Sequence, residues 1–308
     1  MIIKGFLTIV TLLGLLLPAQ ADVTDDQKQI ELCSLDPSAC LEWSTNKLLT
    51  LQINSLKWNR VKQLQLNSLS TLQKFNWLKK ELQPLVDRDD LPPVLKSTVL
   101  TYHAKMLAQE GKTDDAKHYL QSAIDLIKTI NQASFSLMRY VDITNLQLYL
   151  HQYSQAESML LELEQRYSHS QDAHFKLELY SNLGDLYRQT DQPDKQLDYL
   201  QKANKAALEL GNKQQIAVAN YNLGRALQRL GRIADAEKIY QQALELAQHA
   251  QFDNGIILVQ LRLAEIKLAQ QDTNTAKQIL AQLNEQPIPT IHQPLYQQIS
   301  SMLSKISN

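Results

Sequence analysis

The 308-residue sequence has few of the residues that interrupt helices, with only eight glycines and nine prolines. Leu, Gln, Ala and Lys are abundant instead, and this composition favours helices. No charge surplus is present either, because the formal net charge is −1. The balance argues against a nucleic-acid partner, which requires a basic face. It also leaves no polybasic run for an acidic membrane surface.

Long apolar runs are absent apart from the first residues. Lys4 precedes an apolar run over residues 5–17, and Pro18-Ala19-Gln20-Ala21 follows it. A basic start, a short apolar core and a small-x-small end are typical of a secretory signal peptide. We expect cleavage after Ala21 and a periplasmic or secreted protein without a stable membrane span. An uncleaved anchor in the inner membrane is the alternative, although the run is shorter than the roughly 20 residues that span a bilayer.

Cysteine is scarce, and both cysteines lie close together in LCSLDPSAC. An even count in an exported chain favours a disulfide between Cys33 and Cys40, with a turn at residues 36–38. Free thiols and a functional pair remain alternatives. The six residues between the cysteines are unlike the two of a thioredoxin-type motif.

The strongest feature is self-similarity at a step of 40 residues. Leu183-Gly184 and Leu223-Gly224 are separated by that step. The same step reaches further pairs with a small second member, namely His103-Ala104, Ile143-Thr144, Leu263-Ala264 and Leu303-Ser304. Twelve residues after the small residue come Ala116, Ala156, Gln196, Ala236 and Ala276. Small residues at such positions let antiparallel helices approach closely, so five helix pairs are predicted, with turns near residues 111, 152, 190, 231 and 271.

These residues resemble the tetratricopeptide repeat. Its first half is matched by Tyr180, Leu183, Gly184 and Tyr187, and its second half by Ala236, Tyr240 and Ala243. The resemblance covers about residues 97–286. The usual repeat has 34 residues, and the longer step is similar to the variant in kinesin light chains and in bacterial regulators with extended second helices. The resemblance implies an all-α, right-handed α-solenoid that binds proteins.

The ends of the chain are expected to complete this solenoid. We divide the sequence into a signal peptide (1–21), a divergent helical region (22–96), five repeats (97–286) and a C-terminal capping helix (287–308). The region 22–96 loses the repeat register and is interpreted as an N-terminal cap. A separate partner-binding role for it is the alternative.

Catalytic and cofactor-binding motifs are absent from the sequence. It contains no Gly-rich phosphate loop, no His-Glu-x-x-His and no Gly-x-Ser-x-Gly. His169 and His174, with Asp172 between them, could be read as a metal site, but a solvated loop is the simpler interpretation. His103 is interpreted as a packed core residue and not as a metal ligand, because no second ligand lies one helical turn away. We therefore expect no enzymatic activity, no cofactor and no metal.

The resemblance implies that the first helix of each pair lines a concave groove. Position nine of one repeat then neighbours position six of the next, which predicts the pairs Lys105 with Asp142, Asn145 with Asn182, Asp185 with Asn222, and Arg225 with Arg262. The first pair is expected to form a salt bridge. The amide groups of Asn145, Asn182 and Asn222 are expected to hold an extended peptide backbone.

Two adjacent arginines predict an anion site. Arg225 and Arg262, with Arg229 one turn beyond Arg225, are expected to bind an acidic side chain or a free C-terminus of a protein or peptide partner. The alternative is that Asp185, Glu265 or solvent satisfies them. Some family members clamp partner C-termini with five residues, and Asn222 and Arg262 fall on two of those positions. Ser181, Asp185 and Leu258 occupy the other three, so that clamp is not reproduced.

The sequence therefore predicts a non-enzymatic scaffold or adaptor of the bacterial cell envelope that binds a partner segment in its groove. A periplasmic peptide-sensing module that signals through a separate membrane protein is the second hypothesis. An enzyme is the third, and no constellation of residues supports it.

Overall fold

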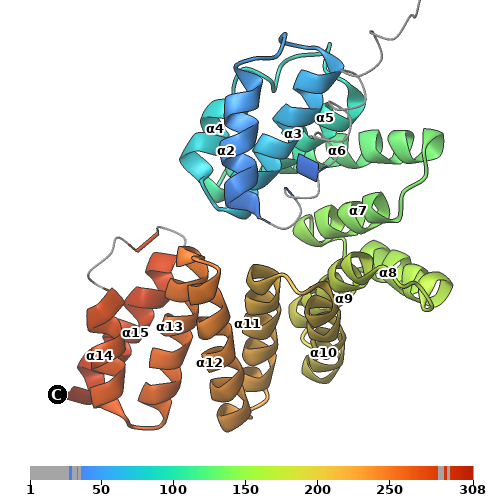
Figure 1. Ribbon diagram of the computed structural model, residues 1–308. Coiled ribbons are helices and arrows are strands. Elements are labelled where there is room, and N and C mark those ends of the chain that lie inside the picture. The colour runs from blue at the N-terminus through green and yellow to red at the C-terminus, as the bar shows by residue number, and fades with distance from the viewer. Residues whose placement is uncertain (1–27, 30–32, 34–35, 284–287, 290–291, 308) are drawn as a thin grey trace, which may run out of the picture. The chain divides into compact units, whose positions relative to one another are not determined.

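The computed structural model describes residues 28–29, 33, 36–283, 288–289 and 292–307, and all regular structure among them is helical (Figure 1). The predicted signal peptide lies outside the described residues. The chain forms two compact units, residues 1–84 and residues 85–308. The predicted all-α class is confirmed.

The first unit contains α2 (Pro37–Leu48), α3 (Leu56–Thr71) and α4 (Phe75–Leu82). Helix α3 packs against both other helices. The buried apolar side chains of this unit are Cys40, Leu41, Trp58, Val61, Leu66, Leu69, Leu78 and Leu82. A buried charge is also accommodated, because Lys62 donates to Gln65 Oε1 at 2.9 Å and pairs with Glu81.

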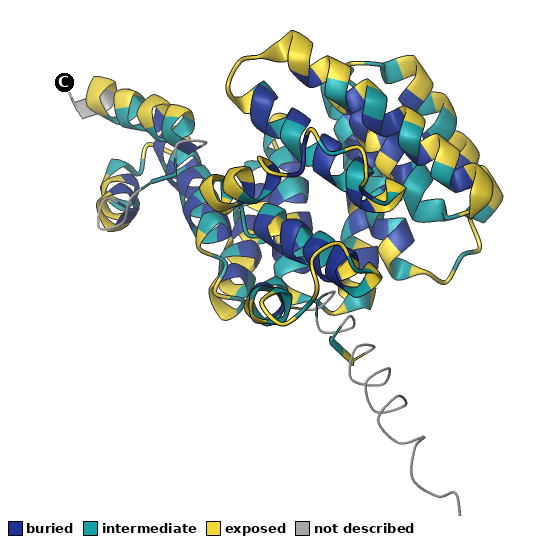
Figure 2. Cartoon of the chain, turned by 90° about the horizontal axis from the view of Figure 1, so that it is seen from above, coloured by how far each residue is buried: buried dark blue, intermediate teal, exposed yellow. Residues whose placement is uncertain are grey.

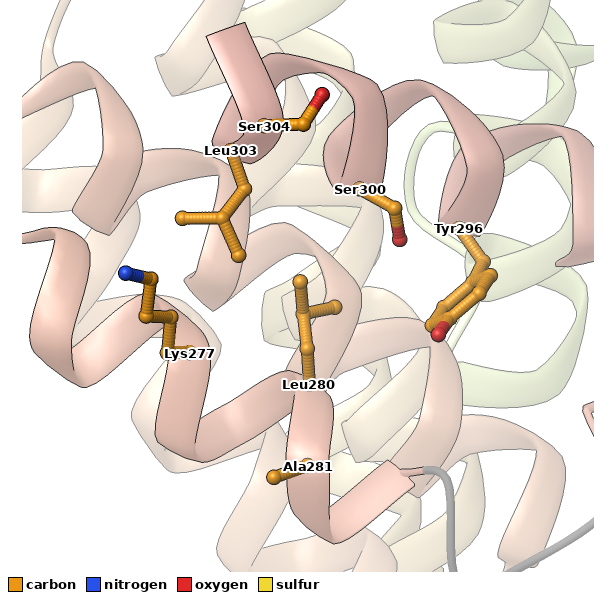
Figure 3. Close-up of a pocket in the computed structure, with 7 residues that line it drawn as sticks. All are labelled: Lys277, Leu280, Ala281, Tyr296, Ser300, Leu303 and Ser304. Carbon is orange, nitrogen blue, oxygen red and sulfur yellow. The ribbon is translucent and has the colours of Figure 1, made fainter. Parts of the chain in front are cut away.

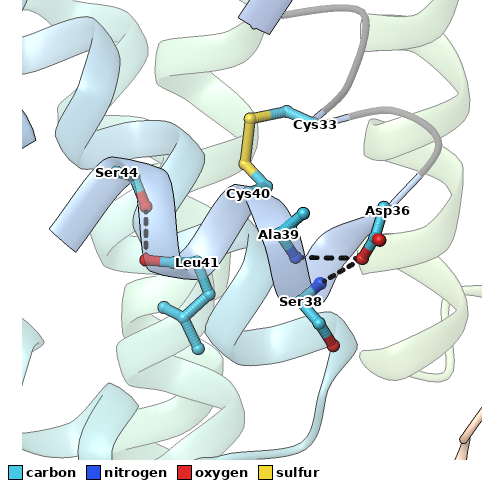
Figure 4. The surroundings of a disulfide bond; sticks show 7 residues. All are labelled: Cys33, Asp36, Ser38, Ala39, Cys40, Leu41 and Ser44. Atoms are coloured by element: carbon cyan, nitrogen blue, oxygen red, sulfur yellow. Dashed lines mark hydrogen bonds between the residues drawn. A yellow bond between two sulfur atoms is a disulfide. The ribbon is translucent and has the colours of Figure 1, made fainter. Parts of the chain in front are cut away.

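A disulfide joins Cys33 to Cys40 beside the start of α2 (Figure 4). It is the first of the three states that the sequence left open. Asp36 begins the helix, since its carboxylate accepts from the backbone N–H groups of Ser38 and Ala39, both at 2.9 Å. Pro37 at the first helical position has the φ angle that a helix needs. The disulfide and the cap therefore fix the same short segment from two sides.

The second unit is a series of helical hairpins followed by α15. Its helices are α5 (Pro93–Gln109), α6 (Thr113–Ala133), α7 (Leu137–Tyr149), α8 (Tyr153–Tyr167), α9 (Ala173–Gln189), α10 (Pro193–Leu210), α11 (Lys213–Arg229), α12 (Ile233–His249), α13 (Asp253–Ala269), α14 (Thr273–Leu283) and α15 (Gln293–Ser307). We call α5, α7, α9, α11 and α13 first helices, and α6, α8, α10, α12 and α14 second helices. Nearly all contacts link helices that are adjacent in this order or one step apart.

The turn inside each hairpin has the same backbone geometry. A left-handed residue recurs at Gly111, His151, Asp191, Gly231 and Gln271, each 40 residues after the last. The N–H of the next residue donates to a carbonyl five positions earlier, in the pairs Lys112–Leu107, Gln152–Gln147, Gln192–Tyr187, Arg232–Leu227 and Asp272–Lys267. This arrangement satisfies carbonyls that the end of the first helix leaves unpaired.

Glycine sets the approach of the two helices in the third and fourth hairpins. A Cβ added at Gly184 would lie 2.6 Å from Leu200 Cδ2, and one at Gly224 would lie 2.6 Å from Tyr240 Cε1. Tyr240 is fully buried and Leu200 is nearly so. The buried residues occupy the facing sides of neighbouring helices, and exposed residues occupy the outer sides (Figure 2). The hairpins are therefore held by close packing between consecutive helices.

Candidate functional site

The first helices carry the polar side chains that were predicted to line a groove. Side-chain hydrogen bonds link α7 to α9 and α11 to α13. We call this set of residues the first-helix face and define it by Lys105, Asp142, Asn145, Glu178, Asn182, Asn222, Arg225 and Arg262. It includes five of the six residues that the sequence analysis assigned to a groove.

Asn145 and Asn182 are neighbours, as their 37-residue spacing predicts, and Asn145 Nδ2 donates to Asn182 Oδ1 at 3.3 Å. Their roles differ. Asn182 is buried, and its Nδ2 donates to Val141 O and to Thr144 Oγ1, both at 3.2 Å. Its amide is thus occupied within the protein and braces α9 against α7, whereas Asn145 is exposed to water. Asn145 is the member of the pair with an amide available to a ligand.

Arg262 is compensated by a carboxylate on its own helix. Its Nη1 donates to Glu265 Oε2 at 2.8 Å, and its Nε lies 3.5 Å from the Tyr221 hydroxyl of α11. Burial opposes the charge, yet Tyr221 and Glu265 hold the pKa of Arg262 above its ordinary value. Gln228 on α11 also donates to Glu265 Oε2, at 2.9 Å. Glu265 was one of the alternatives that the sequence left open for satisfying these arginines.

Arg225 is different, since its guanidinium lies over the Tyr221 ring at 5.8 Å from the centroid. Among the described residues no carboxylate forms an ion pair with it. Arg225 and Arg262 supply two positive charges and Glu265 one negative charge, so this cluster keeps one uncompensated positive charge. We call Tyr221, Arg225, Arg262 and Glu265 the arginine cluster.

Arg229, the third arginine of the predicted anion site, is paired within the protein. Its Nη2 donates to Asp191 Oδ1 at 2.9 Å and its Nη1 donates to Gln196 Oε1 at 2.7 Å. Both partners belong to the preceding hairpin, one in its turn and one on α10. Arg229 therefore connects two successive hairpins. Its counter-charge comes from a turn residue, which a comparison of residues 37 positions apart does not include.

Asn222 is half-buried on α11, one turn before Arg225 along the helix surface.

The expected salt bridge between Lys105 and Asp142 is not formed, and the ammonium of Lys105 lies instead 5.9 Å from the Tyr102 ring centroid. Burial lowers the pKa of Lys105. Asp142 touches water, but surrounding protein replaces part of its hydration; this burial, followed by the charge of Glu178, raises the pKa of Asp142 to about 6. Burial also raises the pKa of Glu178. The predicted pairing considered only Asp142 as a partner of Lys105. In the structure a second carboxylate, Glu178 on α9, also interacts electrostatically with the Lys105 ammonium.

Glu178 and Tyr221 were not predicted to be members of this face. Both lie on first helices, but the prediction compared only position nine of one repeat with position six of the next. Electrostatically the face is graded. Its α7–α9 part carries two carboxylates, and its α11–α13 part carries the uncompensated arginine.

The histidines show no metal-binding geometry. Within the described part of the chain, no group of three or more His, Cys, Asp or Glu side chains could hold a metal ion. His169 is in the α8–α9 loop and His174 is exposed on the first turn of α9. His103 packs edge-on against Tyr119 of α6, with 4.8 Å between ring centroids. No described helix is both long and apolar enough to cross a membrane.

Two family models, both described as tetratricopeptide repeat, match the sequence over residues 177–209 and residues 215–283. These segments are similar to the tetratricopeptide repeat. They cover most of α9 and α10 and of α11 to α14, and the hairpins α5–α6 and α7–α8 repeat the same turn geometry ahead of them. No curated protein sequence matches the chain.

Solved structures with the same fold include three proteins determined in complexes. A Rap protein complexed with Competence and Sporulation Factor has a TM-score of 0.64 and 12% identity, over 93% of this chain and 78% of that one. NprR with its cognate peptide NprX has a TM-score of 0.56 and 16% identity, over 85% and 77%. Bacillus thuringiensis PlcR with the peptide PapR7 and DNA has a TM-score of 0.52 and 13% identity, over 66% and 74%. At these identities the likeness concerns the fold.

Proposed function

We propose that this protein is a non-enzymatic binding module whose first-helix face holds an extended segment of a protein or peptide partner. The similarity to tetratricopeptide repeats supports the class of activity, and the fold is shared with proteins solved in complex with peptides. The proposal also assigns the repeats to the 40-residue-step variant. Turns with left-handed residues 40 positions apart support that assignment.

The observation that carries the proposal is the uncompensated charge of Arg225. A guanidinium held against a tyrosine ring, with its neighbour Arg262 already paired to Glu265, is ready to bind one carboxylate in a forked geometry. Asn222 lies nearby on the same helix and offers an amide to a peptide backbone. We therefore propose that Arg225 binds an acidic side chain or the C-terminal carboxylate, with Asn145 and Asn222 holding the backbone.

The grading of the face suggests an orientation for the bound segment. Asp142 and Glu178 would attract a basic side chain or a free amine, while Arg225 attracts the carboxylate. A partner segment would then run from α7 toward α13 with its acidic end last. Arg262 and Asn182 act indirectly in this proposal, by fixing Tyr221 and Asn145 respectively.

A synthetic peptide array tests this proposal. Short peptides are presented with either a free C-terminal carboxylate or a C-terminal amide, and binding is measured for the intact protein, Arg225→Ala and Arg232→Ala. Arg232 is a matched control because it lies in the α11–α12 turn and pairs with Asp235 on the first turn of α12. We expect carboxylate-dependent binding that Arg225→Ala weakens about tenfold or more, because a charge-assisted hydrogen bond contributes about 1.5–3 kcal/mol. Equal binding by all three proteins, with circular dichroism unchanged, would refute the proposal.

We further propose that the protein works in the bacterial cell envelope as a scaffold or adaptor. The signal-peptide pattern supports export, and a disulfide is compatible with an extracytoplasmic compartment. Cell fractionation tests the location and separates a cleaved periplasmic form from an anchored one. Affinity capture from envelope extracts then separates the scaffold, which predicts large stable complexes, from the alternative of a peptide sensor, which predicts transient small ligands.

A separate binding role for the first unit is a second candidate. The α2–α3 loop exposes Leu49 and Ile53 at 83% and 66% of their surfaces, and Leu56 at the start of α3 is 86% exposed. Three aliphatic side chains so exposed within eight residues are typical of an interaction surface. Replacing all three by serine should abolish capture of a partner by this unit and leave peptide binding at Arg225 unchanged.

A further inference from the structure

Apolar side chains can meet water by lining a hollow or by lying exposed on a loop, and this protein shows both. Between α14 and α15 there is a hollow of about 430 Å³, where Leu280 and Leu303 point toward one another (Figure 3). In the first unit Leu49 and Ile53 lie exposed on the α2–α3 loop, and Leu56 lies exposed at the start of α3. A hollow can accept a side chain, whereas an exposed loop is suited to entering another molecule or another phase.

The α2–α3 loop has a defined conformation. The N–H of Ser55 donates to Gln52 O at 3.1 Å and closes a turn in which Asn54 is left-handed, with φ of 68°. Asn59 Nδ2 on α3 donates to Asn54 O at 3.2 Å, and Ser55 Oγ caps α3 by accepting from Trp58 N at 3.1 Å. The backbone is thus ordered before any ligand arrives, so binding costs little further conformational entropy.

Positive charge surrounds this loop, and negative charge is absent from it. Residues 43–80 contain seven Lys or Arg and no Asp or Glu, although the whole chain has 32 acidic and 31 basic residues. The basic residues are spaced along three helices and form no consecutive run. Lys62 is paired with Glu81. Lys47 in the last turn of α2 and Arg60 in the second turn of α3 flank the loop, and neither forms an ion pair with a described side chain.

This combination fits the surface of an anionic lipid bilayer. A bilayer accepts aliphatic side chains without a complementary shape, and its anionic headgroups attract Lys and Arg. A second copy of the chain fits less well, because a two-fold contact through this loop would bring the same basic residues together. No acidic residue between 43 and 80 would offset that repulsion.

We propose that the α2–α3 loop binds the surface of an anionic membrane. Leu49, Ile53 and Leu56 enter the apolar edge of the bilayer, while Lys47 and Arg60 contact the phosphate groups of the lipids. This assignment rests on the second candidate role proposed above for the first unit and names its partner. The association is peripheral, since only side chains of a loop and of one helix end enter the lipid.

Vesicle co-sedimentation measures this binding. The protein is the processed chain that begins at Asp22, because the apolar run of residues 5–17 would itself bind lipid. The probes are vesicles of phosphatidylcholine, alone or mixed with phosphatidylglycerol. We expect the chain to bind the mixed vesicles at least tenfold more tightly, and added salt should weaken this binding because it screens the charges.

Two sets of variants separate the apolar and the electrostatic contributions. Replacing the three aliphatic residues together by serine should weaken binding about tenfold or more, because their burial in lipid is lost. The charge reversals Lys47→Glu and Arg60→Glu, made together, should weaken it by a similar factor.

Matched controls come from exposed residues of the second unit. Leu161→Ser with Leu208→Ser removes aliphatic surface that is 38% and 59% exposed. Lys205→Glu with Lys213→Glu makes the same change of net charge as the reversals beside the loop, at two exposed positions. Both control proteins should bind the mixed vesicles as the native chain does, and circular dichroism should be unchanged in every variant.

A new tryptophan reports whether the loop enters the lipid. Ile53→Trp keeps the position apolar, and brominated lipids quench the fluorescence of an indole that enters the bilayer. The native chain, with its three tryptophans, is the reference. Quenching of the Ile53→Trp protein should exceed that of the native chain, and equal quenching would overturn the proposed insertion.

Four other outcomes would overturn the proposal. They are equal binding to both kinds of vesicle, binding that the serine variant retains, equal weakening by the control variants, and a dimer in sedimentation velocity that the serine variant abolishes. Absence of vesicle binding, together with capture of an envelope protein that the serine variant loses, would assign the loop to a protein partner instead. Arg225→Ala should leave vesicle binding unchanged and the serine variant should leave carboxylate-peptide binding unchanged, so failure here is distinguishable from failure of the first-helix face.

Discussion

The contact between Gly224 and Tyr240 provides the sharpest test of how these hairpins are held together. The perturbation is Gly224→Ala, which adds one methyl group. Its carbon would lie 2.6 Å from Cε1, 2.8 Å from Cδ1 and 3.1 Å from Cζ of the tyrosine ring. Ordinary carbon contacts are about 3.5–4.0 Å, so α11 and the ring must separate by about 1 Å.

The ring has little freedom to move. Tyr240 has no exposed surface, and its hydroxyl donates to Gln228 Oε1 at 3.0 Å. Its ring centroid is also 6.0 Å from that of Tyr221. Overpacking of this kind costs about 1–3 kcal/mol. Because the ring is confined, the cost should lie in the upper part of this range, at about 2–3 kcal/mol. The gain in helix propensity from glycine to alanine is about 1 kcal/mol, so we expect a net loss of about 1–2 kcal/mol.

Urea unfolding followed by circular dichroism measures this loss, and hydrogen exchange should localise it to α11 and α12. Gly184→Ala provides a graded comparison. Its clash is with the flexible side chain of Leu200, which can change rotamer, so its net loss should be smaller. A double-mutant cycle with Tyr240→Ala separates the ring contact from other effects. A Gly224→Ala protein as stable as the native one, or an equal loss in the Tyr240→Ala background, would refute the reasoning.

Three further predictions concern the turns, the carboxylates and the disulfide. Gln271 is left-handed with φ of 63°, so Gln271→Gly should stabilise the protein by about 0.5–1 kcal/mol in urea unfolding, and a destabilised variant would contradict this. The pKa of Asp142 is raised to about 6 in the folded protein, so the fold favours the protonated carboxyl. The contribution of Asp142 to stability is therefore fully present below about pH 4 and is lost as the pH rises through about 6. Asp142→Asn should therefore raise the melting temperature at about pH 7.5 but not at about pH 4, and an equal change at both would contradict it. Reduction of Cys33–Cys40, which closes a loop of sequence separation 7, should destabilise the first unit by about 2 kcal/mol. Tryptophan fluorescence reports this change because all three tryptophans are in that unit, and an unchanged urea midpoint would count against it.

The repeat architecture could be predicted because small residues and turn residues recur at a fixed step. Gly184 and Gly224 indicated close helix contacts, and the structure shows the side chains that fill them. The turn sequences GKTDD, TDQPD and GRIAD contain the left-handed residues Gly111, Asp191 and Gly231. The close helix contacts and the turns each depend on the residue type at one repeated position, so both can be predicted directly from the sequence.

The chemistry of the first-helix face was only partly predictable. A spacing rule placed Asn145 beside Asn182, but it could not show that Asn182 is buried and saturated with hydrogen bonds. The same rule paired Lys105 with Asp142 and omitted the competing field of Glu178. The partner of Arg229, Asp191, lies in a turn that the rule did not include. Each of these outcomes depends on a third residue, and pairwise spacing does not contain that information.

The brace formed by Asn182 has a mechanical consequence for the second unit. Side-chain hydrogen bonds tie α7 to α9 and α11 to α13, but among the described residues none joins α9 directly to α11. The connection from α9 to α11 instead passes through the second helix α10, by way of Asn204 with Asn220 and Gln196 with Arg229. A ligand that contacts both Asn145 and Arg225 would add a direct link between the two pairs of first helices.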